Sequence, residues 1–175
     1  MHHFILPTAD AWISSGSNTN TTGTSQRDQN FGQDEILELK KFYYNDSFDH
    51  ETRILVNFKG DDFNELSNSI SGSSMTSTQL TSSIPHASTG LTKYYLRLYE
   101  AEGNQELSTD YQIQAFALSQ SWDEGRGKFG DNPKVTNGVS WENRNNNPGN
   151  NAVTWSHFGQ AGGADDKRHG GHFMT

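Results

Sequence analysis

Hydrophobic and polar residues alternate most clearly in two stretches near the middle of the chain, Tyr94–Tyr99 (YYLRLY) and Tyr111–Leu118 (YQIQAFAL). A period of two, rich in aromatic and branched side chains, is typical of a half-buried β-strand. The second stretch becomes hydrophobic on both faces at Phe116 and Leu118, as in a strand that is covered on both sides. We predict two adjacent antiparallel strands, after which the chain leaves the sheet at Ser121–Gly125.

Similar patterns predict further short strands before and after this pair. These strands cover Phe4–Leu6, Ala9–Ile13, Glu35–Lys40, Arg53–Lys59 and Ala152–Trp155. In the fourth of them, the alternation predicts that Ile54 and Val56 face inward and that Leu55 faces outward. Repeated short strands separated by turn-forming residues predict an all-β protein.

One short helix is expected within this all-β fold, over Asp61–Ile70. Asp62 and Glu65 have the spacing of a capping box, and apolar residues then recur every three or four positions. Three polar stretches rich in turn-forming residues, 14–30, 71–90 and 125–151, are predicted to be long loops. The predicted protein therefore combines strands, long polar loops and a single helix.

The composition supports a loop-rich β protein. The length of 175 residues fits one domain with a real core, which we assign to residues 1–158. Residues 159–175 are rich in glycine, show no periodicity and are predicted to form an irregular tail. Hydrophobic residues make up 31% of the chain and charged residues only 19%, so Ser, Thr, Asn, Gln and Gly supply much of its polarity. The periodic aromatic runs argue against a disordered chain.

The charge of the chain excludes one class of partner. Its formal net charge is -8, and a surface that binds phosphate backbones needs clustered Lys and Arg, so we expect no nucleic acid partner. No apolar stretch approaches the roughly 20 residues needed to cross a bilayer, so no membrane partner is expected either. The N-terminus shows no signal-peptide pattern. The absence of cysteine favours assembly in a reducing cell without requiring it.

Acidic residues in the first predicted loops are candidates for a structural calcium site, because Ca²⁺ binds carboxylate and carbonyl oxygens in such loops. Asp10 and Asp34 are the candidate ligands, and a cap or turn role is the ordinary alternative. A second group lies in and near the Gly-rich tail and comprises His157, Asp165, Asp166, His169 and His172. A metal site there is not favoured, because an irregular segment does not hold its ligands in place. No other cofactor is expected.

No motif predicts catalysis. Asp123 and Glu124 are adjacent and would face opposite ways on an extended segment, so they would not flank one glycosidic bond. The chain contains no G-x-S-x-G motif and no phosphate-binding Gly–Lys motif. We therefore expect no enzymatic activity.

The four tryptophans are candidates for ligand binding, because a flat ring suits the apolar face of a sugar. The alternative is a place in the core, which we expect for at least two of the four. Trp122 and Trp141 lie beside predicted strand ends, where burial is common. Trp12 and Trp155 are therefore the candidate ligand-binding residues.

Several segments, taken in order, resemble DNRLRE-type domains. They are Ala9–Ile13 (ADAWI), Asn30–Leu39 (NFGQDEILEL), Thr52–Phe58 (TRILVNF), Tyr94–Tyr99 (YYLRLY), Ser121–Gly125 (SWDEG) and Val139–Trp141 (VSW). The order and approximate spacing hold from Ala9 to Trp141, which is most of the chain. Each motif alone is weak, and the resemblance depends on finding them all in sequence.

This resemblance implies a jelly-roll β-sandwich akin to carbohydrate-binding modules, with no catalytic residue to carry over. Such domains occur in extracellular polysaccharide-active proteins and in structural proteins of tailed-bacteriophage particles, and the phage forms resemble this chain more closely. The expected function is a non-enzymatic virion protein of the neck, tail or capsid surface. It would assemble in the host cytoplasm in several copies beside other virion proteins. The alternative is an extracellular carbohydrate-binding module whose ligand is a glycan.

Members of the family usually continue for several strands beyond the segment that corresponds to Val139–Trp141, whereas this chain stops soon after Trp155. A jelly roll without its last strands exposes an unpaired sheet edge, and such edges attract another chain. Two interpretations follow: the chain is a fragment of a longer protein, or a partner covers the edge.

Overall fold

The computed structural model describes residues 4–16, 25–44, 47–71, 95–101, 112–149 and 151–155. The chain divides into two compact units. One comprises Met1–Thr8 and Asn57–Asp110, and the other comprises Ala9–Val56 and Tyr111–Thr175. Within the described residues the regular structure is mostly strand, with one helix, in agreement with the predicted all-β class. The predicted tail, 159–175, lies outside these residues.

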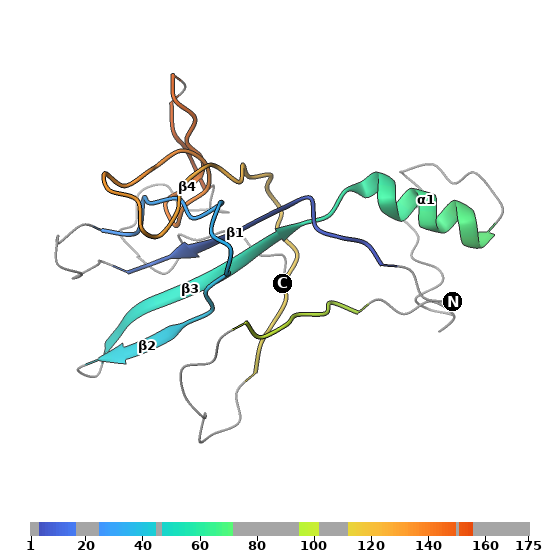
Figure 1. Cartoon of the computed structure of the whole chain (residues 1–175), viewed down its shortest axis with the longest axis horizontal. Coiled ribbons are helices and arrows are strands. Elements are labelled where there is room, and N and C mark those ends of the chain that lie inside the picture. The colour runs from blue at the N-terminus through green and yellow to red at the C-terminus, as the bar shows by residue number, and fades with distance from the viewer. Residues whose placement is uncertain are drawn as a thin grey trace. The chain divides into compact units, whose positions relative to one another are not determined.

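A three-stranded sheet forms the centre of the second unit. Its strands are β1 (Ala9–Ser14), β2 (Lys41–Tyr44) and β3 (Ser47–Asn57), in the order β1-β3-β2 (Figure 1). β2 and β3 run antiparallel and pair Lys41 with Glu51 and Tyr44 with Ser47. β1 lies on the other side of β3, where the Ser15 N–H donates to the Glu51 carbonyl at 2.9 Å. The predicted strand over Ala9–Ile13 is thereby confirmed.

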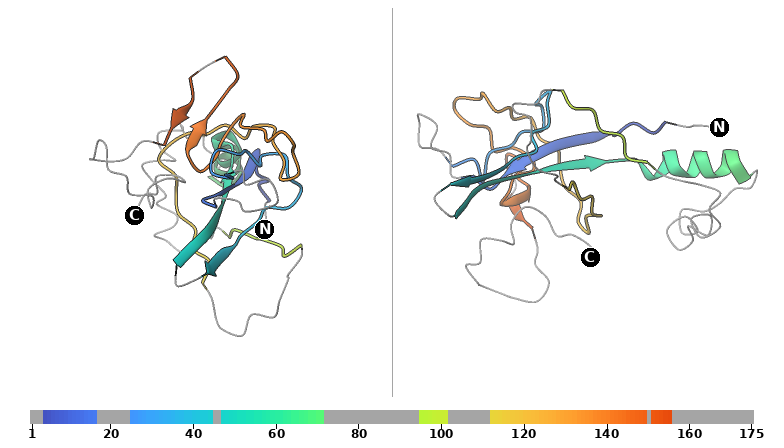
Figure 2. Two further views of the ribbon diagram at one scale, coloured as in Figure 1. Left: turned by 90° about the vertical axis from the view of Figure 1, so that its left-hand side faces the viewer. Right: turned by 90° about the horizontal axis from the view of Figure 1, so that it is seen from below.

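A second, smaller sheet consists of β4 (Asn143–Asn145) and β5 (Val153–Thr154), which pair antiparallel (Figure 2). β5 falls within the strand predicted over Ala152–Trp155. β4 lies in a stretch that was predicted to be a loop, and its sequence, NRN, has none of the apolar alternation that signals a strand. The pairing with β5 therefore defines β4 more than its own residues do.

The single helix, α1 (Gly60–Ser71), agrees with the predicted helix. Asp61 and Asp62 occupy its first turn, where carboxylates interact favourably with the helix dipole. The rings of Phe58 and Phe63 meet edge to face, with 6.4 Å between their centroids, and so attach the first turn to the residues before it. No helix in the described part of the chain has the length and apolar character of a membrane span.

The hydrophobic core lies between the first sheet and segments far along the chain. Its buried members are Ala11, Ile13, Leu55, Val139, Trp141 and Trp155, with Leu118 and Trp122 packed against them. Two or more tryptophans were expected in the core, and this is confirmed. The prediction that Leu55 faces outward is wrong, because it is only 2% exposed. Val139, Trp141 and Trp155, all distant in sequence, cover the face of β3 that carries Leu55.

The predicted central pair of strands is wrong for the residues that the structure describes. Residues 95–101 and 112–117 contain no strand, and their large side chains are exposed, with Tyr95 and Tyr99 at 81% each and Phe116 at 51%. Phe4–Leu6 and Glu35–Lys40 also lack strand structure, and the strand near the latter begins only at Lys41. A strand exists only with a hydrogen-bonded partner strand, and apolar alternation alone does not supply one.

Two buried tryptophans differ in one hydrogen bond and provide a test of the core. The Trp155 indole N–H donates to the Ser140 carbonyl at 3.0 Å, whereas the Trp141 Nε1 is buried without a partner in the described structure. We expect Trp155→Phe to lower the free energy of unfolding by about 1 to 3 kcal/mol more than Trp141→Phe, because only the former leaves a buried carbonyl unpaired. Chemical denaturation of both variants measures this difference, and equal losses would contradict it.

Candidate functional site

Asn30 joins three segments that are far apart in the sequence. Its side chain is fully buried, and its Nδ2 donates to the backbone oxygens of Glu124 and Val139, both at 2.7 Å. Its Oδ1 accepts from the backbone N–H of Gly127 at 2.7 Å and of Gly32 at 3.2 Å. Both amide donors and both acceptor positions are therefore used. We call these five residues the Asn30 network.

Close backbone packing around this network requires glycine. Gly138 has a φ of 99°, and a Cβ placed on it would overlap the backbone of Gly125. A Cβ on Gly127 would overlap the carbonyl oxygen of Asn30. The segments that carry the family resemblance around positions 30, 125 and 139 therefore meet at one buried point, where they fix the loops.

Asp34 fixes an aromatic cluster beside β1. Its Oδ2 accepts from the Trp12 indole N–H at 2.8 Å, and its Oδ1 accepts from the Phe129 backbone N–H at 3.0 Å. Trp12 stacks on Phe31 with 3.8 Å between ring centroids. Phe129, which is 51% exposed, lies tilted against both rings. The carboxylate thus holds a surface loop against the sheet.

The adjacent acidic residues Asp123 and Glu124 bind different parts of the chain. Glu124 Oε1 accepts from the Asp10 backbone N–H at the start of β1, at 3.0 Å. Asp123 Oδ2 accepts from the Asn147 side-chain amide at 2.8 Å. Each carboxylate therefore holds a separate segment of the chain. This agrees with the expectation that the two adjacent side chains face different ways.

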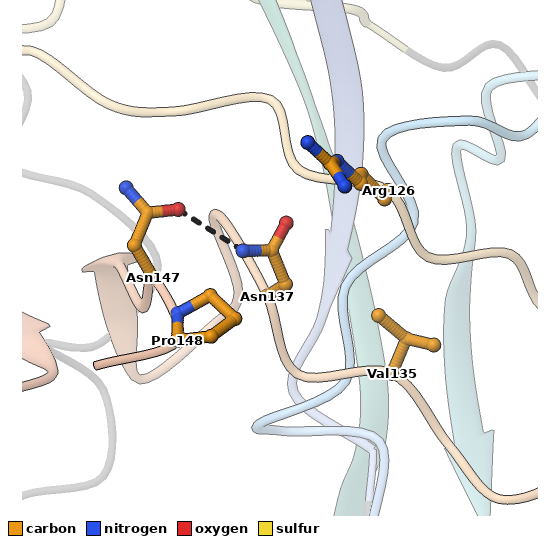
Figure 3. A pocket seen from close by; sticks show the side chains of 5 residues that line it. All are labelled: Arg126, Val135, Asn137, Asn147 and Pro148. Atoms are coloured by element: carbon orange, nitrogen blue, oxygen red, sulfur yellow. Dashed lines mark hydrogen bonds between the residues drawn. The ribbon is translucent and has the colours of Figure 1, made fainter. Parts of the chain in front are cut away.

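A pocket of about 420 Å³ opens beside the Asn30 network (Figure 3). It is lined by Arg126, Val135, Asn137, Asn147 and Pro148. The Asn137 Nδ2 donates to the Asn147 Oδ1 at 3.0 Å. Figure 3 shows the side-chain oxygen of Asn137, Oδ1, turned away from Asn147, on the side where Arg126 lies. The pocket thus presents a hydrogen-bond acceptor and a cationic donor between two apolar side chains.

The residues predicted to bind ligands lie in the interior or in structural contacts. Trp12 and Trp155 are each only 2% exposed, so neither ring offers a free face to a sugar in this structure. Asp10 lies at the start of β1 and Asp34 in the aromatic cluster. Among the described residues, no three His, Asp or Glu side chains gather into a group that could hold a metal ion. The calcium site at Asp10 and Asp34 stays a prediction.

The candidate metal ligands His157, Asp165, Asp166, His169 and His172 lie outside the described residues. Sequence reasoning missed Arg126 and Asn137, because both fall in a stretch that was interpreted only as a loop. The available signal was its unusual density of Gly and Asn, in DEGRG and TNG. Comparison with models of protein families, with curated proteins and with solved structures finds no match to this chain.

Proposed function

We propose that the chain is a non-enzymatic structural protein of a tailed-phage particle, with a jelly-roll β-sandwich as its body. In this role it attaches to the neck, tail or capsid surface beside other virion proteins, in several copies. Multiple copies on a symmetric particle turn weak individual contacts into strong overall attachment. The proposal rests on the resemblance to DNRLRE-type domains together with the mostly β structure.

One observation carries this proposal: in the segments that resemble DNRLRE-type domains, the buried and half-buried polar side chains hold loops in place. Asn30 uses all its side-chain hydrogen-bonding groups on backbone. Asp34 and Glu124 accept backbone N–H groups from segments distant in sequence. A scaffold that fixes its loops in this way is suited to presenting a surface to a partner.

The alternative function, a carbohydrate-binding module of a secreted protein, relied on sugar stacking at Trp12 and Trp155. Both rings are buried, so that version of the alternative loses its expected binding platform. We therefore place the particle role first.

Mass spectrometry of gradient-purified phage particles tests the proposed function. We expect the chain at a constant ratio to the major capsid protein across the gradient fractions that contain particles. An antibody against the full chain should label the same particles in electron micrographs. Recovery of the chain only from particle-free culture medium would overturn the proposal and favour the secreted alternative.

A further inference from the structure

Asn137 begins a short relay of side-chain hydrogen bonds whose direction is fixed. Its Nδ2 donates to the Asn147 Oδ1 at 3.0 Å (Figure 3), and the Asn147 Nδ2 donates to the Asp123 Oδ2 at 2.8 Å. An ionised carboxylate only accepts hydrogen bonds, so Asn147 turns its nitrogen toward Asp123. Asn147 then has only its oxygen left for Asn137. Position 137 therefore requires a side chain that donates, as an amide does.

Asn137 is also followed by glycine, and Asn137–Gly138 is the only Asn–Gly pair in the sequence. In such a pair the backbone nitrogen of the glycine, once deprotonated, can attack the Cγ atom of the asparagine side chain. A C–N bond forms, and the side-chain NH₂ takes up a proton and leaves as ammonia. Water then opens the cyclic succinimide to aspartate or isoaspartate. Glycine permits this ring closure most readily, because it has no Cβ and its backbone is the least restricted.

The folded chain holds the attacking nitrogen of Gly138 in place. Its N–H donates to the Asn146 carbonyl at 3.1 Å, and a nitrogen that keeps its proton is a poor nucleophile. Gly138 is buried, and its backbone packs closely on that of Gly125. The N–H of the next residue, Val139, donates to the Asp123 carbonyl at 2.7 Å. Turning the Gly138 nitrogen toward the preceding side chain would break these contacts, so the fold opposes the reaction.

We propose that Asn137–Gly138 is a deamidation site that the folded chain keeps closed, and that modification during an opening breaks the relay. Aspartate at position 137 sets a carboxylate oxygen against the Asn147 Oδ1, so two acceptors meet. Arg126 lies on the other side of the Asn137 side chain (Figure 3) and does not donate into that contact. Isoaspartate adds a methylene group to the backbone next to the close packing of Gly138. A modified chain therefore does not regain the original contacts, whether or not it is attached to a particle.

Site-resolved mass spectrometry of the full chain, kept at mildly alkaline pH with and without guanidinium chloride, tests the site. We expect Asn137 to be converted to the acid at least about tenfold more slowly in the folded chain than in the unfolded chain, because reaction then requires opening. Asn147 is an internal control in the same relay: Pro148 follows it and has no backbone N–H, so no succinimide forms in either state. Asn30→Ala, which removes bonds that hold the loops around Gly138, should raise the rate at Asn137 toward that of the unfolded chain.

Thermal unfolding of Asn137→Asp tests whether modification breaks the relay. We expect its midpoint to fall by several degrees, whereas Asn151→Asp, which adds the same charge at an exposed position, should leave the midpoint nearly unchanged. Three results would each overturn the inference: equal rates at Asn137 in the folded and unfolded chain, no faster reaction in Asn30→Ala, or equal midpoints for the two aspartate variants. Absence of the chain from purified particles would remove the proposed attachment role and leave this inference intact.

Discussion

Replacing Asn30 with alanine is expected to lower the free energy of unfolding by about 3 to 5 kcal/mol, because buried groups that lose a hydrogen-bond partner each cost about 1 to 3 kcal/mol. The change removes four side-chain hydrogen bonds. It leaves the carbonyls of Glu124 and Val139 and the N–H of Gly127 without this partner. Urea denaturation followed by tryptophan fluorescence measures the loss, since three of the four tryptophans are buried.

Two further variants separate the amide network from a general effect of substitution. Asn30→Asp keeps the shape of the side chain but presents a carboxylate oxygen to the two carbonyls that now receive N–H groups, so it should destabilise at least as much as alanine. Asn151→Ala removes an exposed amide and should change stability by less than about 0.5 kcal/mol. If Asn30→Ala and Asn151→Ala have the same midpoint, the Asn30 network does not hold the loops together.

Gly138→Ala is expected to cost about 3 kcal/mol or more. Two effects combine: a φ of 99° that L residues rarely adopt, and overlap of the new Cβ with the backbone of Gly125. An unfavourable backbone conformation costs of order 1 to 3 kcal/mol, and overpacking adds a similar amount. The overlapping atoms are the Cα and N of Gly125, and backbone atoms cannot move aside as a flexible side chain would. Thermal unfolding followed by circular dichroism measures the loss.

Gly149→Ala is the matched control for this substitution. Gly149 has a φ of 88° but nothing within 4 Å of the position of a new Cβ. It therefore tests the cost of the backbone conformation alone, which we expect to be about 1 kcal/mol. Equal losses for the two variants would show that packing against Gly125 contributes nothing.

The sequence predicted those elements whose signal is local. The apolar alternation at the start of the chain corresponds to β1, and Asp62 with Glu65 marked a helix that the structure contains as α1. Both patterns depend on residues within a few positions of one another. The same kind of pattern failed at Tyr94–Tyr99, whose described residues lie exposed and without strand structure. Alternation shows which side chains would share a face, but it does not supply the neighbouring strand.

The candidate site was harder to predict because its contacts connect distant parts of the chain. Asn30 binds backbone atoms 94, 97 and 109 positions further along. The segments that resemble DNRLRE-type domains include those around Asn30, Gly125 and Val139, but the resemblance did not show that these segments meet. Arg126 and Asn137 carry no signal of their own, since an exposed arginine and an asparagine before glycine are ordinary loop residues.

The long separation within the Asn30 network has a consequence for biosynthesis. Asn30 and Val139 lie 109 residues apart, so at 5 to 20 residues per second a ribosome needs roughly 5 to 20 s to make the second after the first. During that interval Ala11 and Ile13 lack the later core residues Val139, Trp141 and Trp155, and Phe31 lacks Phe129. Folding of this unit must therefore wait until Val139, Trp141 and Trp155 have been translated, and a chaperone that shields the earlier nascent residues should raise the yield of native protein.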